Sequence, residues 1–203
     1  MIRSSMAIID SGIEKLRTGV LVSIISGIIG IAAIVLFYIF IFIAAVSSST
    51  TGHSFGKSAA VAITAAAFAS LIAVCAGLGF YALLNMRTGF RIMSSSNSKY
   101  KTGVLGTTLS LSGLVLATAG VITIIAAYFA LSPANPWTVS GFIPAIIGAV
   151  VGLVGGLLLI ISFYRVGAQY DNSLVQVGAV LMIFIGIIGM ILMYIGLLEI
   201  GKR

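Results

Sequence analysis

The residues that could carry chemistry are few in this sequence, and they lie far apart. His53 is the only histidine and Cys75 the only cysteine. Four acidic residues lie near the ends of apolar stretches or in the segments between them: Asp10, Glu14, Asp171 and Glu199. A lone cysteine in an alanine-rich stretch behaves as a small apolar side chain, because nothing beside it stabilises the thiolate. The sequence therefore predicts no catalytic residue, no metal ligand and no cofactor site, and we expect the protein not to be an enzyme.

Composition places the chain in a membrane. Of its 203 residues, 60% are hydrophobic and 7% are charged, whereas soluble domains carry about 25% charged residues. The mean hydropathy is +1.24. The single cysteine cannot form a disulfide within the chain. These values exclude a soluble enzyme, a disordered chain and a disulfide scaffold.

Five apolar stretches are long enough to cross a bilayer, which takes about 20 residues. They are Thr18–Val46, Ala59–Asn85, Thr102–Leu131, Phe142–Tyr164 and Leu174–Ile200. No Asp, Glu, Lys or Arg lies in the interior of any of them. The sequence therefore predicts an all-α bundle of five transmembrane helices that forms a single membrane domain over residues 1–203 and has the lipid bilayer as its surroundings.

Residues 1–17 precede the first stretch and are amphipathic. Ser11 and Glu14 have the spacing of a capping box, which favours a helix that begins there. Apolar residues recur at helical spacing through Ile9, Ile13 and Leu16. This pattern predicts a short helix on the membrane surface, and the alternative is an N-terminal extension of the first transmembrane helix.

Basic residues near the spans predict the orientation, because they concentrate on the cytoplasmic side. With five spans, one side holds eight of them: Arg3, Lys15, Arg17, Arg87, Arg91, Lys99, Lys101 and Arg165. The other side holds Lys57, Lys202 and Arg203. The N-terminus is therefore expected in the cytoplasm of a multi-pass cell-membrane protein, and the C-terminus outside. The net charge of +7 is explained by this asymmetry and requires no nucleic acid. The basic segment from Arg87 to Lys101 is expected to attract anionic lipid headgroups.

Small residues recur along one face of each of the first four stretches, and more sparsely in the fifth. The faces are Gly19, Ser23, Ser26, Gly30 and Ala33; Ala62, Ala66, Ala69, Ala73 and Ala76; Gly106, Ser110, Gly113, Ala117 and Gly120; Gly141, Ala145, Gly148, Gly152 and Gly155; and Gly178, Gly189 and Gly196. Membrane helices associate closely through such residues. We expect these faces to pack within the bundle, and the alternative is a face for other membrane subunits.

The third stretch carries several hydroxyl groups, among them Thr108, Ser112 and Thr123, which share one face of a helix. They could line a path for a solute. We expect them instead to bond neighbouring helices or carbonyl groups one turn back on their own helix.

A short internal repeat relates two parts of the chain. Lys15-Leu-Arg-Thr-Gly-Val-Leu21 recurs as Lys99-Tyr-Lys-Thr-Gly-Val-Leu105. This similarity suggests a duplication in which helices of the same direction correspond.

Several short motifs resemble a known family. They are Ile13-Glu-Lys-Leu-Arg-Thr-Gly19, Arg87-Thr-Gly-Phe-Arg-Ile92, Phe163-Tyr-Arg-Val-Gly167 and Tyr194-Ile-Gly-Leu197. The chain resembles an uncharacterised archaeal family of integral membrane proteins called domain of unknown function number nine hundred and seventy-three. The resemblance implies an archaeal cell membrane, but it brings no activity, cofactor or site residue.

Two hypotheses of function follow from these observations. The first is a non-enzymatic structural or accessory subunit of a membrane complex, packed through its small-residue helix faces. The alternative is a channel or facilitator for a small neutral or weakly polar solute, based on the repeat and the hydroxyl-rich third stretch.

Overall fold

The computed structural model describes residues 2–50, 55–130 and 136–202, which form six α-helices and one short 3-10 helix. The four long helices are α1 (Ile2–Thr50), α2 (Phe55–Ser96), α3 (Lys101–Ala130) and α4 (Pro136–Gln169). The 3-10 helix η1 (Ser98–Tyr100) lies between α2 and α3, and two shorter helices follow α4: α5 (Ser173–Leu181) and α6 (Gly186–Ile200). The described residues contain no strand, so the chain is all-helical as predicted.

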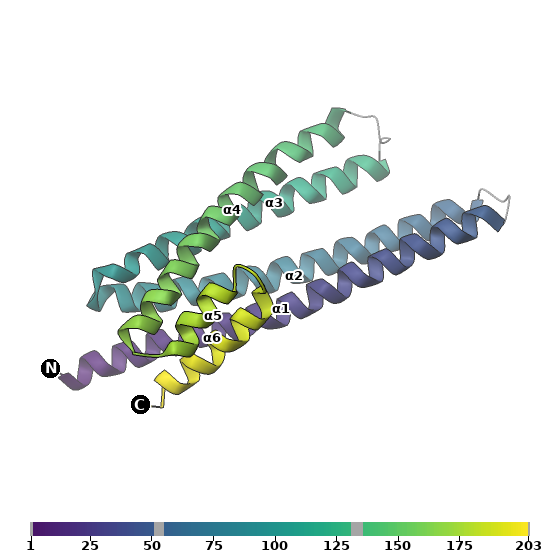
Figure 1. Ribbon diagram of the computed structural model, residues 1–203. Coiled ribbons are helices and arrows are strands. Elements are labelled where there is room, and N and C mark those ends of the chain that lie inside the picture. Colours follow the sequence, from purple (N-terminus) through teal and green to yellow (C-terminus); the bar gives the residue numbers. More distant parts are fainter. Residues whose placement is uncertain (1, 51–54, 131–135, 203) are drawn as a thin grey trace.

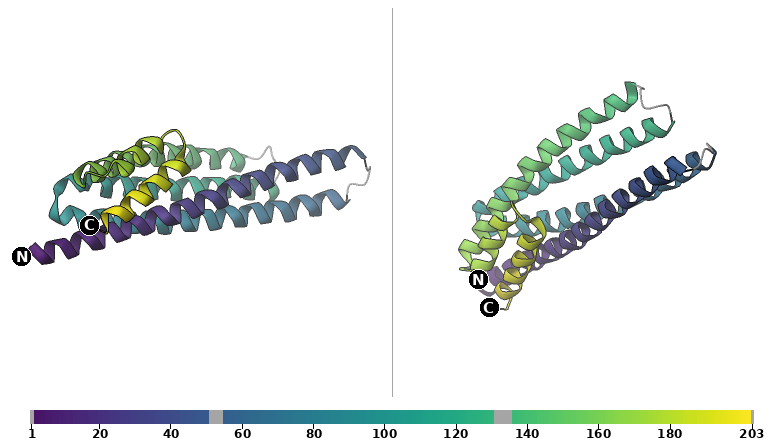
Figure 2. Two further views of the ribbon diagram at one scale, coloured as in Figure 1. Left: turned by 60° about the horizontal axis from the view of Figure 1, so that its bottom comes forward. Right: turned by 45° about the vertical axis from the view of Figure 1, so that its right-hand side comes forward.

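The long helices form two antiparallel hairpins, α1–α2 and α3–α4, which meet at one end and diverge toward the other (Figure 1). We call the end that holds η1 and the connection from α4 to α5 the closed end, and the opposite end the open end. The short α5–α6 hairpin lies at the closed end, where α5 contacts α4 and α6 contacts α1. The right-hand view in Figure 2 shows the same divergence of the long hairpins.

Within the described residues, four helices are long and apolar enough to cross a membrane. Their apolar segments are Asp10–Leu36, Ser70–Ser96, Ser98–Ile124 and Ser140–Gln169. They correspond to the first four predicted spans. The prediction of a membrane protein with several apolar helices is therefore supported by the structure, with α3 matching its predicted span to within one residue at each end.

The N-terminal residues continue α1 and do not form a separate helix. The α-helix runs unbroken from Ile2 to Thr50, so the predicted helix start at Ser11 is wrong, and the alternative of an extended first helix describes the backbone. The reason is tertiary packing. Ile13 and Leu16 are buried against α2 in the core at the closed end. This packing stabilises helical backbone on the C-terminal side of Ser11, so the Ser11–Glu14 pattern lies inside the helix and does not begin it.

The fifth predicted span, Leu174–Ile200, is not one helix. It is divided into α5, of 9 residues, and α6, of 15 residues, with a turn at Met182–Ile185 between them. The two helices lie backbone to backbone. A Cβ at Gly178 would lie 2.8 Å from the carbonyl oxygen of Gly189, and one at Gly189 would lie 2.6 Å from that of Gly178. A bilayer-crossing helix needs about 20 residues, so neither helix is long enough to cross alone.

This division changes where the chain ends. Because α6 runs back along α5, residues near the C-terminus lie at the closed end, the same end as the N-terminus (Figures 1 and 2). The predicted placement of the two termini on opposite sides of the membrane depended on a fifth crossing.

Small residues set the register of the α1–α2 hairpin. A Cβ at Gly89 would lie 2.7 Å from the carbonyl oxygen of Gly12, and one at Gly19 would lie 2.8 Å from that of Ala82. One heptad further along α1, the Ser26 hydroxyl donates to the Cys75 carbonyl at 3.1 Å. The pairs recur every seven residues, the period of a left-handed pair of helices.

The contact face of α2 differs from the predicted one. Ala73 is exposed, whereas Cys75, Ala82 and Gly89 face α1. The side chains of Ala62, Ala66 and Ala69 lie outside the described residues. Alanine is so frequent in this stretch that small residues line more than one face, and the sequence offers no criterion for choosing among them.

The predicted small-residue faces of α3 and α4 meet each other. Cβ atoms at Gly113, Gly120 and Gly155 would lie 2.6 to 2.8 Å from carbonyl oxygens of the facing helix, and the partners are Gly148, Gly141 and Gly106 in that order. Gly152 leaves more room, since a Cβ there would lie 3.9 Å from the Gly113 Cα. The expectation that these faces pack within the bundle is confirmed for α3 and α4.

The buried core lies at the closed end and joins all three hairpins. Its largest fully buried side chains are Phe90 of α2 and Phe163 of α4, whose ring centroids are 5.3 Å apart in an edge-to-face arrangement. Leu16, Val175 and Leu197 bring α1, α5 and α6 to the same cluster. The α5–α6 hairpin thus connects the last long helix to the first.

Candidate functional site

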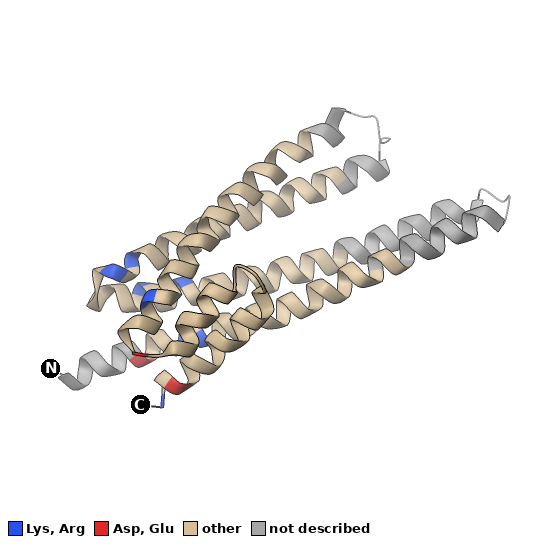
Figure 3. Ribbon diagram, in the orientation of Figure 1, with Lys and Arg blue, Asp and Glu red and all other residues tan. Residues whose placement is uncertain are grey.

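The charged residues among the described side chains gather at the closed end (Figure 3). The basic ones are Lys15, Arg17, Arg87, Arg91, Lys99, Lys101, Arg165 and Lys202. The four acidic residues of the chain lie at this end too. The rest of the described bundle carries no ionisable Asp, Glu, Lys or Arg side chain, so polar recognition is concentrated at the closed end.

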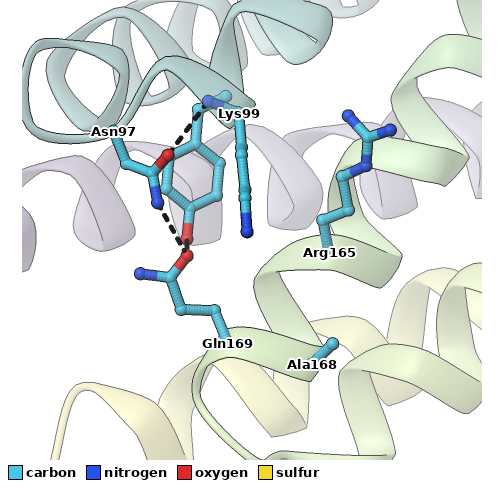
Figure 4. A pocket seen from close by; sticks show the side chains of 6 residues that line it. Asn97, Lys99, Arg165, Ala168 and Gln169 are labelled. Carbon is cyan, nitrogen blue, oxygen red and sulfur yellow. Dashed lines mark hydrogen bonds between the residues drawn. The ribbon is translucent and has the colours of Figure 1, made fainter.

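An open cavity of about 640 Å³ lies at this end, between the start of α3 and the last turns of α4. Its lining comes from two parts of the chain: Asn97, Lys99 and Tyr100 before α3, and Arg165, Ala168 and Gln169 in α4 (Figure 4). Two of the six lining residues are basic and none is acidic. The cavity therefore has a positive electrostatic character.

Asn97 shapes the turn that brings Lys99 to the cavity. Its backbone is extended, with φ −147° and ψ 118°, and its side-chain Oδ1 accepts the Lys99 backbone N–H at 3.0 Å. This is the hydrogen bond of a helix N-cap. The following residue, Tyr100, is buried, and its ring anchors the turn in the core while Lys99 stays exposed.

Gln169 joins the two sides of the cavity. Its Oε1 accepts the Tyr100 hydroxyl at 2.7 Å and the Asn97 side-chain amide at 3.3 Å. A side-chain carbonyl oxygen has two lone pairs, so these two donors use its accepting capacity. The end of α4 is thereby tied to the turn before α3.

Arg165 occupies the α4 side, where its Nη1 donates to the Thr102 hydroxyl at 3.1 Å. A guanidinium has five N–H donors and no acceptor, and a lysine ammonium has three donors and no acceptor. Figure 4 shows the Lys99 side chain extending toward α4, with Arg165 on the helix opposite. The groups that remain available in the cavity are thus mostly donors, and two of them are charged.

The connection from α4 to α5 follows directly after Gln169, the last cavity residue of α4. Asp171 has a left-handed φ of 47°, and the Asn172 N–H donates to the Gly167 carbonyl at 2.9 Å, as in a Schellman helix end. Asn172 is buried; it caps α5 through Val175 and donates to the Gly196 carbonyl and to Glu199 Oε2.

Tyr170 stands beside this connection. Burial raises the pKa of its phenol, and the negative charge of Asp10 on α1 adds to the rise. The phenol is therefore uncharged at physiological pH and acts as a neutral hydrogen-bonding group.

The residues singled out from the sequence do not converge on this cavity. His53 lies outside the described residues. The carbonyl of Cys75 serves the contact between α1 and α2, and no group of three or more potential metal ligands occurs among the described side chains. Glu199 accepts a hydrogen bond from the Asn172 side-chain amide.

The hydroxyl groups of the third stretch behave largely as expected. Thr108 donates to the Val104 carbonyl at 2.8 Å and Thr123 to the Ala119 carbonyl at 2.9 Å. Both bonds run one turn back along α3, which confirms the expectation for these two residues. Ser112 is exposed.

Sequence reasoning named no site residue and so missed the cavity. It did single out Lys99 and Arg165, but as charges that orient the chain in the membrane. The signal that could have identified the site was the pair of polar segments, Asn97–Lys101 and Arg165–Asn172, at the ends of consecutive apolar stretches. The short antiparallel connection between those stretches would bring both segments to one end.

Comparisons with known proteins give a family and nothing further. A family model described as a protein of unknown function, DUF973, matches residues 10–203. Searches of curated proteins and of solved structures found no match.

Proposed function

The chain belongs to DUF973, a family of proteins of unknown function, and from its own structure we propose that it is a non-enzymatic accessory subunit of a membrane complex. In this proposal the closed end, with both termini, lies at the cytoplasmic face of the cell membrane. The archaeal membrane implied by the motif resemblance belongs to the same proposal.

The distribution of basic residues supports this orientation. Eight Lys and Arg side chains of the described residues lie at the closed end. At the open end the sequence holds one basic residue, Lys57, in the first turn of α2. Basic residues concentrate on the cytoplasmic side of short loops. With both termini at the closed end, the excess of basic residues on that side of the membrane is larger than in the five-span topology.

The observation that carries the role is the divergence of the two long hairpins (Figures 1 and 2). The hairpins still touch near the middle of α2, where a Cβ at Gly79 would lie 3.6 Å from Leu114. Further toward the open end, Val121 lies one heptad beyond Leu114 on the same face of α3. Within a bilayer, lipid or another helix must fill the space between diverging hairpins, and a partner helix there would contact this face of α3.

The small residues that pair α1 with α2 and α3 with α4 are already used within the chain. A partner would therefore contact the larger apolar side chains. Such an interface gains from van der Waals packing, since lipid is as apolar as leucine.

Co-purification tests this proposal. The tagged full chain, at native expression level in a mild detergent, is expected to retain one membrane protein in a fixed ratio. Val121→Trp, on the face of α3 that Leu114 turns toward α2, should release it. The matched control is Leu153→Trp, at an exposed position of α4, which should retain it. A wild-type chain that runs alone, or a partner retained equally by both variants, would contradict the proposal.

The alternative function, a facilitator for a small neutral solute, has less support. Thr108 and Thr123 direct their hydroxyl groups to carbonyls of their own helix, which leaves them less able to line a polar path. Uptake of a solute into vesicles by the purified chain, abolished by Ser112→Val, would favour this alternative.

The internal repeat fits a duplicated hairpin. Lys15–Leu21 lies in α1 and Lys99–Leu105 leads into α3, so each copy stands near the closed end of the first helix of a long hairpin. Duplication of one ancestral hairpin is part of the same proposal.

A further inference from the structure

We propose that the cavity between η1 and the last turns of α4 binds the phosphate group of an anionic membrane lipid. The inference deepens the proposed function and rests on its orientation, with the closed end at the cytoplasmic face. It assigns a ligand class to residues that otherwise serve only as orientation charges.

The positive charge of the cavity lining favours an anionic ligand. Lys99 and Arg165 line the cavity from opposite elements, and no acidic side chain lines it. Two cations held in one cavity repel each other unless an anion lies between them. A phosphate group supplies both the negative charge and several strong acceptor oxygens.

The hydrogen bonds already present in the cavity also favour a phosphate group, because they leave mainly donors available to a ligand. The side-chain oxygen of Gln169 accepts from Tyr100 and Asn97, and the Asn97 side-chain Oδ1 accepts from the Lys99 N–H. The ammonium of Lys99 and the remaining N–H groups of Arg165 are donors with no accepting capacity. A ligand that fits must therefore bring acceptors, as phosphate does.

These internal bonds also fix the geometry of the site. Tyr100 is 3% exposed, and its hydroxyl holds Gln169 at 2.7 Å. Arg165 is held by Thr102. The cavity is thus shaped before a ligand enters, which lowers the entropy lost on binding.

The position of the cavity favours a lipid over a free phosphate ion. The apolar segments of α3 and α4 begin at Ser98 and end at Gln169, so the cavity lies at the level where a lipid carries its phosphate. Leu157 and Ile161 are 46% and 44% exposed, and they precede Arg165 by eight and four residues on one face of α4. They form an apolar ridge that leads from the cavity into the membrane and can receive an acyl chain.

Binding to the isolated full chain in detergent tests this inference. The probes are short-chain phosphatidylglycerol, phosphatidylcholine with the same chains, and inorganic phosphate. The apparent Kd follows from the rise in Tm with ligand concentration. Phosphatidylglycerol is expected to stabilise the wild type, and Lys99→Gln with Arg165→Gln should weaken its binding about 30-fold.

Matched variants keep the test independent of folding. Arg91→Gln removes an exposed basic residue of α2 at the same end but outside the cavity lining, and it should leave the Kd within about twofold. Lys99→Gln alone should weaken binding about fivefold, and Lys99→Arg should restore it. The Tm of each variant without lipid shows whether its fold is intact.

Three results would overturn the inference. One is a double variant that binds phosphatidylglycerol as tightly as the wild type does. Another is equal binding of phosphatidylcholine. The third is inorganic phosphate that binds at the site while phosphatidylglycerol fails to displace it, which would assign the cavity to a free anion. Because the isolated chain is used, a failure here leaves the co-purification test of the proposed function unaffected.

Discussion

Gly148 has no room for a side chain. A Cβ there would lie 2.7 Å from the Gly113 carbonyl oxygen and would also meet the backbone of Ala117. Backbone atoms cannot move aside as a flexible side chain can. We expect Gly148→Ala to lower the free energy of unfolding by about 1–3 kcal/mol, the usual cost of overpacking, measured by thermal unfolding in detergent.

Gly156, two turns further along α4, is the matched control for Gly148. Apart from its chain neighbours and the backbone of its own helix, a Cβ there would have no heavy atom within 4 Å. Alanine favours a helix over glycine by up to about 1 kcal/mol, so Gly156→Ala should be neutral or stabilising. Equal effects of the two substitutions on the free energy of unfolding would contradict the explanation that close backbone packing excludes a side chain between α3 and α4.

Asn172 is a single buried side chain that organises the short hairpin. It caps α5 and donates to the Gly196 carbonyl at 3.2 Å and to Glu199 at 3.0 Å. Asn172→Ala removes the cap and leaves the carbonyl of Gly196 without this donor. We expect a loss of about 2–3 kcal/mol in the free energy of unfolding.

Asn85 provides the comparison for Asn172 in the same unfolding measurement. It is partly exposed, and its amide donates to the Tyr81 carbonyl on its own helix at 2.9 Å. Asn85→Ala should cost less than about 1 kcal/mol. If both variants lost the same stability, the α5–α6 hairpin would not depend on its buried asparagine.

At the scale of the elements, the register of α1 against α2 can be tested with the native cysteine. The Ser26 hydroxyl donates to the Cys75 carbonyl at 3.1 Å, so the Ser26 side chain lies against the backbone of Cys75. Ser26→Cys is therefore expected to form a disulfide with Cys75 under copper-phenanthroline oxidation, which requires Cα atoms about 4.4–6.8 Å apart. Loss of maleimide labelling after oxidation reports the bond.

Ile28 tests the specificity of that crosslink. It lies on the same helix within one turn of Ser26, but its side chain is 54% exposed. Ile28→Cys should stay available to maleimide after oxidation. A disulfide formed equally well from both positions would mean that α1 has no fixed register on α2.

The sequence was informative where composition changes along the chain. Polar segments delimited α3 closely, and glycines at seven-residue spacing identified the contact between α3 and α4. The face of α2 could not be chosen, because alanine lines several of its faces. The turn at Met182–Ile185 was missed, since every residue of the turn is apolar, and it is stabilised by contacts between Gly178 and Gly189.

The cavity could not be predicted for a different reason. Its two halves are separated by the whole of the α3–α4 hairpin, and their contact depends on the length and register of those helices. Lys99 and Arg165 were visible as charges, but the bonds from Tyr100 and Asn97 to Gln169 exist only in the folded chain.

At the scale of the whole molecule, the side on which the C-terminus lies distinguishes the two topologies. In a Cys75→Ala background, a membrane-impermeant maleimide applied to intact cells should reach Asn135→Cys, in the segment between α3 and α4. It should spare Lys202→Cys and Ser96→Cys, because α6 returns to the closed end. Permeabilised cells supply the control, since every introduced cysteine outside the apolar segments should then react.

Labelling of Lys202→Cys in intact cells while Ser96→Cys is spared would restore the five-span topology and contradict the hairpin arrangement of α5 and α6. Labelling of Ser96→Cys together with protection of Asn135→Cys would reverse the proposed orientation. One set of variants therefore distinguishes an error in the number of spans from an error in the orientation.

The contact of α6 with α1 has a consequence for biosynthesis. Each long hairpin can form while the chain is still being made, because its partners are neighbours in sequence. The core at the closed end cannot form this early, because it contains both Leu16 of α1 and Leu197 of α6. Leu197 leaves the ribosome after all four long helices. A nascent chain stalled before Ser173 would hold an inserted but unfinished bundle, with apolar core residues uncovered at the membrane surface. Such a chain would be a natural substrate for the proteases that clear incomplete membrane proteins, so the α5–α6 hairpin decides whether the product is kept.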